Sequence, residues 1–366
     1  MSVPSTQTAL LVHEKGAPFT LGSRPVPTLQ AGQVLIRNVA AGLNIVDAYI
    51  QKIGLLVDKW PAVAGREGAG DIAAIGEGVT NFAIGDRVFY QSGAGTSDGA
   101  AYQEYTLADA ARVGKIPPNL TYEQAATVPL CLATAAIGMY KSKSSQVLPN
   151  GFDVGGAGLT PPWAEGSMGK YKGQAAVVFR GSSSVGQFAI RLAKLSGFSP
   201  IITTASKSNE EYCLAAGATH VIDYHDVPYP VIPATILTIA GKTPITLSYE
   251  AVGSDESQKA AWSVLSPGGT LVTPAGMASR LVGTQGEDDE EGKRFVRAFG
   301  GVNAPFHQAF GTEMYVSLSD MLEKGLLSPT KLEVIEGGLS GVDAGLARIA
   351  AGVSGVKLVV RVRASH

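Results

Sequence analysis

The chain has 366 residues, 16% of them charged and 45 of them glycine, with a formal net charge of −2 at pH 7. This length predicts two domains, and the near balance of charges excludes a broad basic surface for nucleic acid. Only two cysteines occur, Cys131 and Cys213, which excludes a disulfide framework and fits a reducing compartment. No apolar run nears the ~20 residues of a membrane helix, and residues 1–15 lack a secretory signal, so we expect a cytoplasmic protein with no membrane partner.

The first third of the chain has the pattern of a β-rich domain. Short apolar runs separated by glycine turns predict strands at 8–13, 34–41, 71–75, 87–90 and 99–107. Near Tyr122 the pattern changes to helical spacing, and a loop rich in glycine and proline follows.

Strands and helices then alternate. Residues 175–179 are an apolar run typical of a buried parallel strand, and a small-residue turn, a helix and a second strand at 201–204 follow. Further strands are predicted at 221–224, 247–252 and 269–273. This order indicates a doubly wound parallel sheet, so the fold class is α/β with a second, β-rich domain.

The turn between the first two of these strands has a spacing that suits a dinucleotide. Gly181 and Gly186 occupy the outer positions of G-x-G-x-x-G, and Ser183 replaces the middle glycine. A helix N-terminus after such a turn offers unpaired N–H groups to a pyrophosphate. The alternative is a serine-rich cap on an ordinary helix.

The end of the second strand indicates which cofactor binds. An NAD site needs an acidic residue about 20 residues beyond the turn, but residues 204–209 contain no carboxylate. Lys207 offers a cation, and Ser206 and Ser208 offer hydroxyls, which favours NADPH (NADP+) over NADH. Alternatively, Ser208 or Asn209 only caps the following helix.

The last third of the chain returns to β character. A charge run at 285–294 is interpreted as a solvated loop rather than a metal site. Helices are predicted at 313–325 and 342–351, and strands at 334–338 and 357–362, which rejoin the first domain.

Several motifs together resemble the medium-chain dehydrogenase/reductase superfamily. They are the nucleotide turn and the segments 65–70, 76–79 with 85–88, 337–339 and 354–357. The pattern Asn44-x-x-Asp47-x-Tyr49 resembles the zinc-free quinone oxidoreductase and enoyl reductase branch, and the segments 158–163 and 170–174 are similar to fungal toxin-cluster and trans-acting enoyl reductases. The resemblance implies a GroES-like catalytic domain at 1–128 and 327–366, and an NADP-binding Rossmann domain at 129–326.

The resemblance also implies a set of site residues. Tyr49, Asn44 and Thr134 would be catalytic. The cofactor would be bound by Asn44, Ile45, Val46, Asp47, Thr134, Gly181, Ser182, Ser183, Ser184, Val185, Gly186, Ser206, Lys207, Ser208, Asn209, Tyr224, Pro274, Ala275, Val353 and Ser354. Some of these residues have a structural alternative: Asn44 as a turn residue, Thr134 as a helix hydroxyl bonded to its own backbone, and Tyr224 as packing at a strand end.

No zinc site is expected. A catalytic zinc needs about three protein ligands and a structural zinc about four. Zinc alcohol dehydrogenases carry a Cys where this chain has Asn44 or its neighbours, and a His where it has Arg66. The four-cysteine lobe of those enzymes is absent from the sequence.

The expected reaction is hydride transfer from NADPH to the β-carbon of an α,β-unsaturated ketone or aldehyde. Tyr49 is the candidate proton donor to the enolate oxygen or the α-carbon. The alternatives are that Tyr49 is a core tyrosine or that water delivers the proton.

Other functions remain open: a quinone reductase, a trans-acting enoyl reductase that docks on a polyketide synthase carrier domain, or a protein that binds NADPH without turnover. The chain is expected to be a monomer or homodimer, and the acidic residues 287–291 could block pairing through the Rossmann sheet edge.

Overall fold

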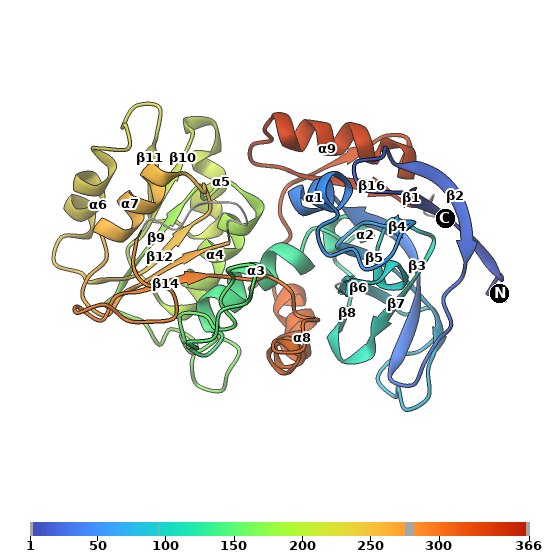
Figure 1. The fold of residues 1–366 in the computed structure, drawn as a ribbon. Helices are drawn as coiled ribbons and strands as arrows, with labels where there is room; N and C mark the ends of the chain where they lie inside the picture. Colours follow the sequence, from blue (N-terminus) through green and yellow to red (C-terminus); the bar gives the residue numbers. More distant parts are fainter. Residues whose placement is uncertain (1–2, 94, 275–281, 364–366) are drawn as a thin grey trace. The chain divides into compact units, whose positions relative to one another are not determined.

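The computed structural model describes residues 3–93, 95–274 and 282–363 (Figure 1). It divides the chain into two compact units. Unit 1 comprises Met1–Leu130 and Gly301–His366, and unit 2 comprises Cys131–Gly300. The chain passes from unit 1 to unit 2 within helix α3 (Pro129–Tyr140).

The return to unit 1 comes earlier than the sequence predicted, at residue 301 instead of 327. The reason is helix α8 (Gln308–Glu323), which packs against the 3-10 helix η2 (Ala110–Arg112) and strand β8 (Val113–Lys115). The hydroxyl of Ser319 on α8 also donates to the carbonyl of Lys115 over 2.9 Å. Residues 301–326 therefore belong to the β-rich unit.

Unit 1 contains a seven-stranded sheet with the order β15–β16–β3–β5–β6–β8, and β7 also pairs with β3. A smaller sheet has the order β2–β1–β4. The C-terminal strand β16 runs antiparallel to β3, which places the last strand of the chain in one sheet with strands from its first third. The strands are β1 Thr6–Val12, β2 Thr20–Pro25, β3 Gln33–Gly42, β4 Ala62–Val63, β5 Glu67–Ile75, β6 Arg87–Gln91, β7 Tyr105–Asp109, β15 Leu332–Ile335 and β16 Lys357–Arg361.

One predicted strand is wrong in its first half. Residues 99–107 were expected to be continuous, but Ser97–Gly99 form a 3-10 helix (η1) and β7 begins only at Tyr105. Ala101 and Tyr102 donate their backbone N–H groups to the carbonyls of Gly65 and Ala64 instead. These bonds hold the segment against the start of β5, beside the candidate site.

Helices α1 (Ile45–Ile53), α2 (Tyr122–Ala125) and α9 (Val342–Ala351) complete unit 1. Helix α2 packs on β3 and β5, so β3 is buried along nearly its whole length. Gly42 permits this approach, because a Cβ there would lie 2.7 Å from the carbonyl oxygen of Ala126. The end of β3, where α1 begins, is thereby enclosed.

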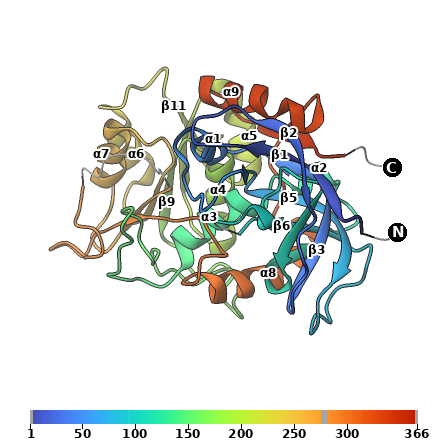
Figure 2. The same ribbon diagram turned by 45° about the vertical axis from the view of Figure 1, so that its right-hand side comes forward.

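Unit 2 is a six-stranded parallel sheet with the order β11–β10–β9–β12–β13–β14. This is the order of a Rossmann domain, in which the chain reverses direction across the sheet between β9 and β12. Figures 1 and 2 show α4 and α5 on one face of the sheet and α6 and α7 on the other. The elements are β9 Ala175–Phe179, α4 Ser184–Ser196, β10 Ile201–Ala205, α5 Glu210–Ala216, β11 His220–Asp223, α6 Ile232–Ala240, β12 Ile245–Glu250, α7 Asp255–Ser263, β13 Thr270–Thr273 and β14 Arg294–Arg297.

The edge strand β14 is covered by its own chain. Gln285 and Asp288 form isolated β-bridges to Phe295 and Arg294, and Asp153 bridges to Ala298. Asp288 also forms ion pairs with Arg294 and Lys143. The acidic segment thus lies beside this edge, as the sequence predicted, and leaves little free backbone for pairing with another strand.

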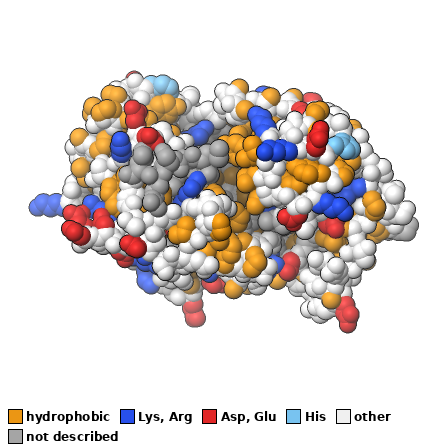
Figure 3. Space-filling model, in the orientation of Figure 1, with side chains coloured by type: hydrophobic (Ala, Val, Ile, Leu, Met, Phe, Trp, Pro, Cys, Tyr) orange, Lys and Arg blue, Asp and Glu red, His pale blue; other side chains and the backbone are white. Residues whose placement is uncertain are grey.

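Charges are mixed on the surface. On the face drawn in Figure 3, lysine and arginine side chains lie among aspartates and glutamates rather than in one basic patch. Among the described residues, no helix combines the length and the apolar character needed to cross a membrane.

Candidate functional site

The nucleotide turn of unit 2 joins β9 to α4. Ser183 is the N-cap of α4, and its hydroxyl accepts the N–H of Gly186 over 3.0 Å. The backbone N–H groups of Ser184 and Val185 find no acceptor among the described residues. Two unpaired donors at the positive end of a 13-residue helix suit an anionic phosphate.

The two glycines of this turn are required by close packing. A Cβ on Gly181 would lie 2.1 Å from Oγ1 of Thr203 on β10. A Cβ on Gly186 would lie 2.4 Å from the carbonyl oxygen of Arg180. Only glycine therefore allows the helix to start this close to the strands, which is the geometry that a pyrophosphate cradle needs.

Arg180, which sequence reasoning missed, stands immediately before this turn. Its φ of 63° lies in the left-handed region that favours glycine. Its N–H donates to Oγ1 of Thr204 over 3.0 Å, and its side chain is exposed. The sequence pattern does not predict this positive φ, because the G-x-G-x-x-G pattern begins at Gly181 and does not include Arg180.

The segment after β10 brings its predicted residues together. The hydroxyl of Ser206 lies 3.1 Å from that of Ser208 and accepts a hydrogen bond from the side-chain amide of Asn209 over 2.9 Å. The ammonium group of Lys207 forms an ion pair with Glu210, and this pairing raises the pKa of Lys207. The cation that was expected to bind the 2′-phosphate, Lys207, is thus already paired with the carboxylate of Glu210. Asn209 stands at the N-cap of α5, but its side chain makes no cap bond.

A second carboxylate lies nearby, on the neighbouring strand. Asp223 accepts the backbone N–H of Lys207 over 2.7 Å and that of His225 over 2.8 Å. These bonds lower the pKa of Asp223. Tyr224 follows it, 39% exposed, with its ring against that of His225, so it is not packed in the core. The predicted 206–209 segment and Tyr224 therefore lie at the same end of the sheet.

Thr134 and Pro274 lie elsewhere in unit 2. Thr134 is buried on α3; its carbonyl accepts the hydroxyl of Tyr249, and a Cβ on Gly300 would touch its Oγ1. Pro274 directly follows β13, and the predicted Ala275 lies outside the described residues. Because all six strands are parallel, the residues that follow them share one edge of the sheet with the nucleotide turn.

Glu250 is a buried acid that the sequence analysis overlooked, and it holds the loop that follows β12. One oxygen of Glu250, at the end of β12, accepts the N–H groups of Val252 and Gly253 and the hydroxyl of Ser257, over 2.7–2.8 Å. Its other oxygen accepts the hydroxyl of Thr273 over 3.3 Å. The side chain is fully buried. Glu250 thereby fixes the chain that leaves β12 beside β9.

In unit 1, the predicted residues 44–49 form the start of α1. Asn44 caps the helix, and its backbone N–H donates to the carboxylate of Asp47 over 2.9 Å. Ile45 is exposed and Val46 half-buried. Val353 and Ser354 lie between α9 and β16, where Val353 packs against the core of unit 1.

Asn44 also belongs to a buried ionic network. Its amide donates to Oε1 of Glu67 over 2.9 Å, and its oxygen accepts from Lys357. Lys357 Nζ lies 2.6 Å from the same oxygen of Glu67, and Oε2 of Glu67 accepts the N–H of Leu130 over 2.8 Å. Glu67 is fully buried and Lys357 is 4% exposed. Asn44 is therefore more than a turn residue, since it connects the start of α1 to β5 and β16.

Asp47 is the other buried acid of this region. Its carboxylate accepts the hydroxyl of Tyr102 over 2.8 Å and the N–H of Gly65 over 3.2 Å. Burial raises the pKa of Asp47 to about 6, although the hydrogen bonds from Tyr102 and from the backbone of Asn44, and the charges of Arg66 and Lys357, act in the opposite direction. The group therefore titrates close to physiological pH.

We expect the stability of the protein to depend on Asp47 in acid. Since the folded-state pKa is raised from 3.8 to about 6, the folded form binds the proton more tightly. The resulting stabilisation is full below pH 3.8, is lost as the pH rises through about 6, and amounts to about 3 kcal/mol. The free energy of unfolding, measured by urea denaturation at several pH values, should therefore not show this fall in Asp47→Asn. The exposed control Asp58→Asn should show the same fall as wild type. Parallel pH curves for wild type and Asp47→Asn would contradict the assignment.

Tyr49 lies on the outer side of α1. It is half-buried, and its hydroxyl has no hydrogen-bond partner among the described residues. Ile45 and Ile53, one turn before and after it, are 44% and 47% exposed. Within the part of the chain that the structure describes, Tyr49 is thus not a core tyrosine with a satisfied hydroxyl.

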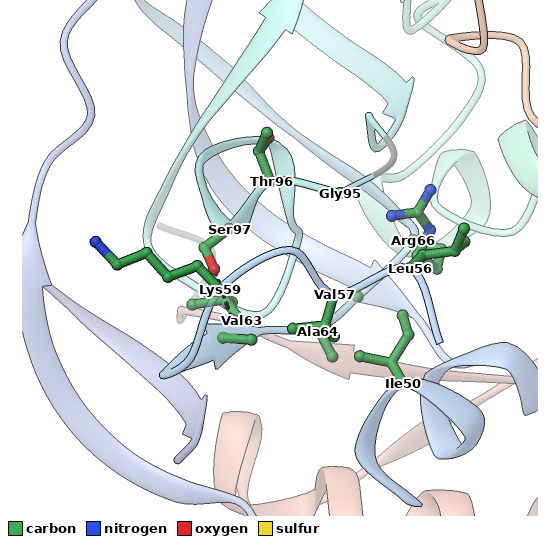
Figure 4. A pocket seen from close by; sticks show the side chains of 12 residues that line it. Ile50, Leu56, Val57, Lys59, Val63, Ala64, Arg66, Gly95, Thr96 and Ser97 are labelled. Atoms are coloured by element: carbon green, nitrogen blue, oxygen red, sulfur yellow. Dashed lines mark hydrogen bonds between the residues drawn. The ribbon is translucent and has the colours of Figure 1, made fainter. Parts of the chain in front are cut away.

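A small pocket with a cavity volume of about 20 Å³ opens in unit 1 beside Arg66 (Figure 4). Ile50 of α1 contributes to its wall, whereas Tyr49 does not. Nη1 of Arg66 donates to the carbonyl of Gly93 over 2.7 Å, and Nη2 to that of Ser92 over 3.4 Å. The remaining wall is mostly apolar, and the residues that line the pocket are Ile50, Leu56, Val57, Lys59, Ala62, Val63, Ala64, Gly65, Arg66, Gly95, Thr96 and Ser97.

Comparison with known proteins assigns both units. Residues 30–118 match the model of the alcohol dehydrogenase GroES-like domain, and residues 184–296 match that of the zinc-binding dehydrogenases. The chain belongs to the medium-chain dehydrogenase/reductase superfamily. The GroES-like and Rossmann fold class expected from the sequence is therefore confirmed, and the chain is an oxidoreductase whose Rossmann domain is of the NAD(P)-binding type.

Relatives of this family match over nearly the whole chain. The chain is 29% identical to the dehydrogenase azaJ of Aspergillus niger, over 97% of this chain and 99% of that protein. It is 27% identical to lovC of Aspergillus terreus, the enoyl reductase component of lovastatin nonaketide synthase, over 98% and 97% of the two chains. The structure of a mycobacterial quinone oxidoreductase superposes with a TM-score of 0.72 at 21% identity, over 97% of this chain and 99% of that one. This structural similarity shows that the two chains share a fold.

The zinc of the matched family model does not fit the residues of this chain. Arg66 has no lone pair with which to bind a metal, and Asn44 is held by Glu67 and Lys357. Across the described ranges, no group of three or more His, Cys, Asp or Glu side chains could hold a metal ion. No step of the reaction is therefore derived through zinc.

Proposed function

We propose that this protein is an NADPH-dependent ene-reductase that reduces the carbon–carbon double bond of α,β-unsaturated ketones or aldehydes. The observation that carries the proposal is the donor set of unit 1. Where zinc dehydrogenases place metal ligands, this chain has the amide of Asn44, which donates to Glu67, and the guanidinium of Arg66. The phenol of Tyr49, on the helix that Asn44 caps, has no hydrogen-bond partner among the described residues. The guanidinium and the phenol suit hydrogen-bond donation to a developing enolate.

Unit 2 supports the cofactor half of the proposal. Its turn offers the N–H groups of Ser184 and Val185 to a pyrophosphate, and the hydroxyls of Ser206 and Ser208 suit the adenosine ribose and its phosphate. Tyr224 offers an exposed ring to the adenine. Bound NADPH would supply the hydride, and the residues of the chain would position the substrate's β-carbon and exclude water.

In this account Tyr49 donates a proton or a hydrogen bond to the substrate. General acid catalysis contributes roughly 100-fold or more, so Tyr49→Phe should lower kcat with the enone by about that factor while NADPH affinity stays unchanged. Steady-state kinetics and fluorescence titration of NADPH measure the two quantities. Tyr122→Phe, which removes a phenol that donates to Asp71, is the control and should keep wild-type kcat. An unchanged kcat in Tyr49→Phe would assign the proton to water.

The preference for NADPH should depend on the pair Lys207–Glu210. Glu210 engages the cation that a 2′-phosphate needs, so Glu210→Gln should raise the ratio of kcat/KM for NADPH over NADH by about two- to fivefold, since the pair is exposed and screened. Lys207→Gln should lower the same ratio. A ratio that neither change moves would place 2′-phosphate recognition on other residues.

A carrier-bound substrate is the second candidate, because one relative is the enoyl reductase component of a polyketide synthase. A trans-acting enzyme of that kind would reduce an enoyl thioester on an acyl carrier domain. Turnover of a carrier-bound enoyl thioester compared with the same thioester on a short pantetheine distinguishes the two. Equal kcat/KM for both substrates would favour the free small molecule.

A further inference from the structure

The segment after β10, which is expected to meet the 2′-phosphate of the cofactor, has carboxylates around its only cation, Lys207. Glu210 already forms an ion pair with Lys207. This pair raises the pKa of Lys207, and the charges of Asp223 and Asp226 act in the same direction. These carboxylates would repel a 2′-phosphate unless a second cation lay close to it.

Arg180 is a cation at the end of the neighbouring strand, β9. Strands β9, β10 and β11 are adjacent and parallel, so the residues that follow them lie along one edge of the sheet (Figure 1). The N–H groups of Arg180 and Gly181 donate to Oγ1 and to the carbonyl of Thr204, each over 3.0 Å. Because Thr204 stands just before the segment 206–209, these bonds hold the backbone of Arg180 beside the start of that segment.

The side chain of Arg180 is exposed and is not engaged by any residue that the structure describes. Its guanidinium forms no ion pair and no hydrogen bond with these residues. Burial raises the pKa of Tyr229, which follows β11, and the charge of Arg180 acts on that pKa in the opposite direction. The guanidinium therefore lies within electrostatic range of the chain after β11, with its N–H donors available to a ligand. Arginine binds phosphate through two parallel hydrogen bonds.

The backbone at Arg180 indicates that folding alone does not explain an arginine there. Its φ of 63° lies in the region that favours glycine and that strains other residues. The conformation is fixed from both sides, since the N–H of Arg180 is bonded to Thr204 and its carbonyl accepts the N–H of Ser183 over 3.0 Å. Glycine would suit this position better. The arginine side chain thus costs stability where it stands, as residues at ligand sites often do.

We propose that Arg180 is the residue that selects NADPH over NADH, by binding the 2′-phosphate of the adenosine ribose from the end of β9. The hydroxyls of Ser206 and Ser208 bind the same group from the end of β10, and Lys207 has a lesser part because Glu210 engages it. This inference rests on the proposed NADPH-dependent function and deepens it by naming the cation of the cofactor site. It concerns only binding of the adenosine half of the cofactor, so either proposal can fail while the other holds.

The test compares adenosine 2′,5′-bisphosphate with adenosine 5′-monophosphate, which lacks only the 2′-phosphate, by calorimetric titration of the full-length protein. Wild type should bind the bisphosphate about tenfold or more tightly, the ratio expected for hydrogen bonds between charged groups. Arg180→Met should remove most of this preference, Arg180→Lys should keep part of it, and Lys207→Gln should lower it less than Arg180→Met does. The matched control is Lys242→Met. Lys242 is an exposed cation that precedes β12, at the opposite edge of the sheet, so its loss should leave the preference unchanged.

Arg180→Gly distinguishes cofactor selection from a structural role. Because glycine suits the left-handed backbone, this variant should lose the preference for the bisphosphate while its midpoint of urea denaturation stays at or above that of wild type. A preference that survives in both Arg180→Met and Arg180→Gly would overturn the proposal, as would equal affinity of wild type for the two nucleotides. A lower urea midpoint in every Arg180 variant would also contradict it, since the arginine would then hold the fold. Enone reduction by wild type with NADPH, measured in parallel, tests the proposed function separately.

Discussion

Replacing Lys357 by methionine is expected to lower the free energy of unfolding by about 3–5 kcal/mol, the usual cost of leaving one partner of a buried ion pair alone. Lys357 is the cation that contacts Glu67, which is fully buried on β5. In the variant, the carboxylate of Glu67 keeps the neutral donors of Asn44 and Leu130 and no cation among the described residues. Chemical denaturation followed by circular dichroism measures the change.

Two controls distinguish the effect of the unpaired buried charge on stability from the effect of losing the lysine side chain. Glu67→Gln combined with Lys357→Met removes both charges and should recover most of the loss, because no unpaired ion remains. Arg348→Met breaks the pair with Glu333, in which both side chains are about half exposed, and should change stability far less. If Lys357→Met costs no more than Arg348→Met, the network does not hold unit 1 together.

Gly186→Ala is expected to weaken NADPH binding by roughly tenfold or more. The added Cβ would lie 2.4 Å from the carbonyl oxygen of Arg180 and 2.9 Å from Cα of Gly181. Both neighbours are backbone atoms, so the turn itself must move and the N–H groups of Ser184 and Val185 move with it. Overpacking of this kind costs about 1–3 kcal/mol, and 1.4 kcal/mol corresponds to a factor of ten in affinity.

The matched control for Gly186→Ala adds the same methyl group where it meets nothing. A Cβ on Gly93 has no neighbour within 4 Å, so Gly93→Ala should keep wild-type NADPH affinity and stability. Fluorescence titration of NADPH measures both variants. Wild-type affinity in Gly186→Ala would mean that the cofactor does not bind at the N-terminus of α4.

The nucleotide-binding unit was predictable because its signals are local. Residues 175–179 form β9 with the predicted bounds, and their continuous apolar character reflects a strand that is buried on both faces. The glycine spacing of the turn follows from contacts within a few residues of it. Local patterns of this kind need no knowledge of the rest of the chain.

The buried network of unit 1 was not predictable, because its partners are far apart in the sequence. Asn44 is 23 residues from Glu67 and 313 from Lys357. No periodicity connects such positions. Helix α8 was recognised as a helix for local reasons, but the unit on which it packs depends on η2 and β8, about 200 residues earlier. The pair Lys207–Glu210 differs from these cases, since its i,i+3 spacing could have been read from the sequence.

The proposed function requires that the protein deliver hydride to carbon rather than to oxygen. The most direct measurement is incubation with NADPH and a conjugated enone, followed by identification of the product by mass spectrometry and NMR. We expect the saturated ketone, with its carbonyl intact and one hydride on the β-carbon. An allylic alcohol as the product, or consumption of NADPH with a quinone but not with the enone, would contradict it.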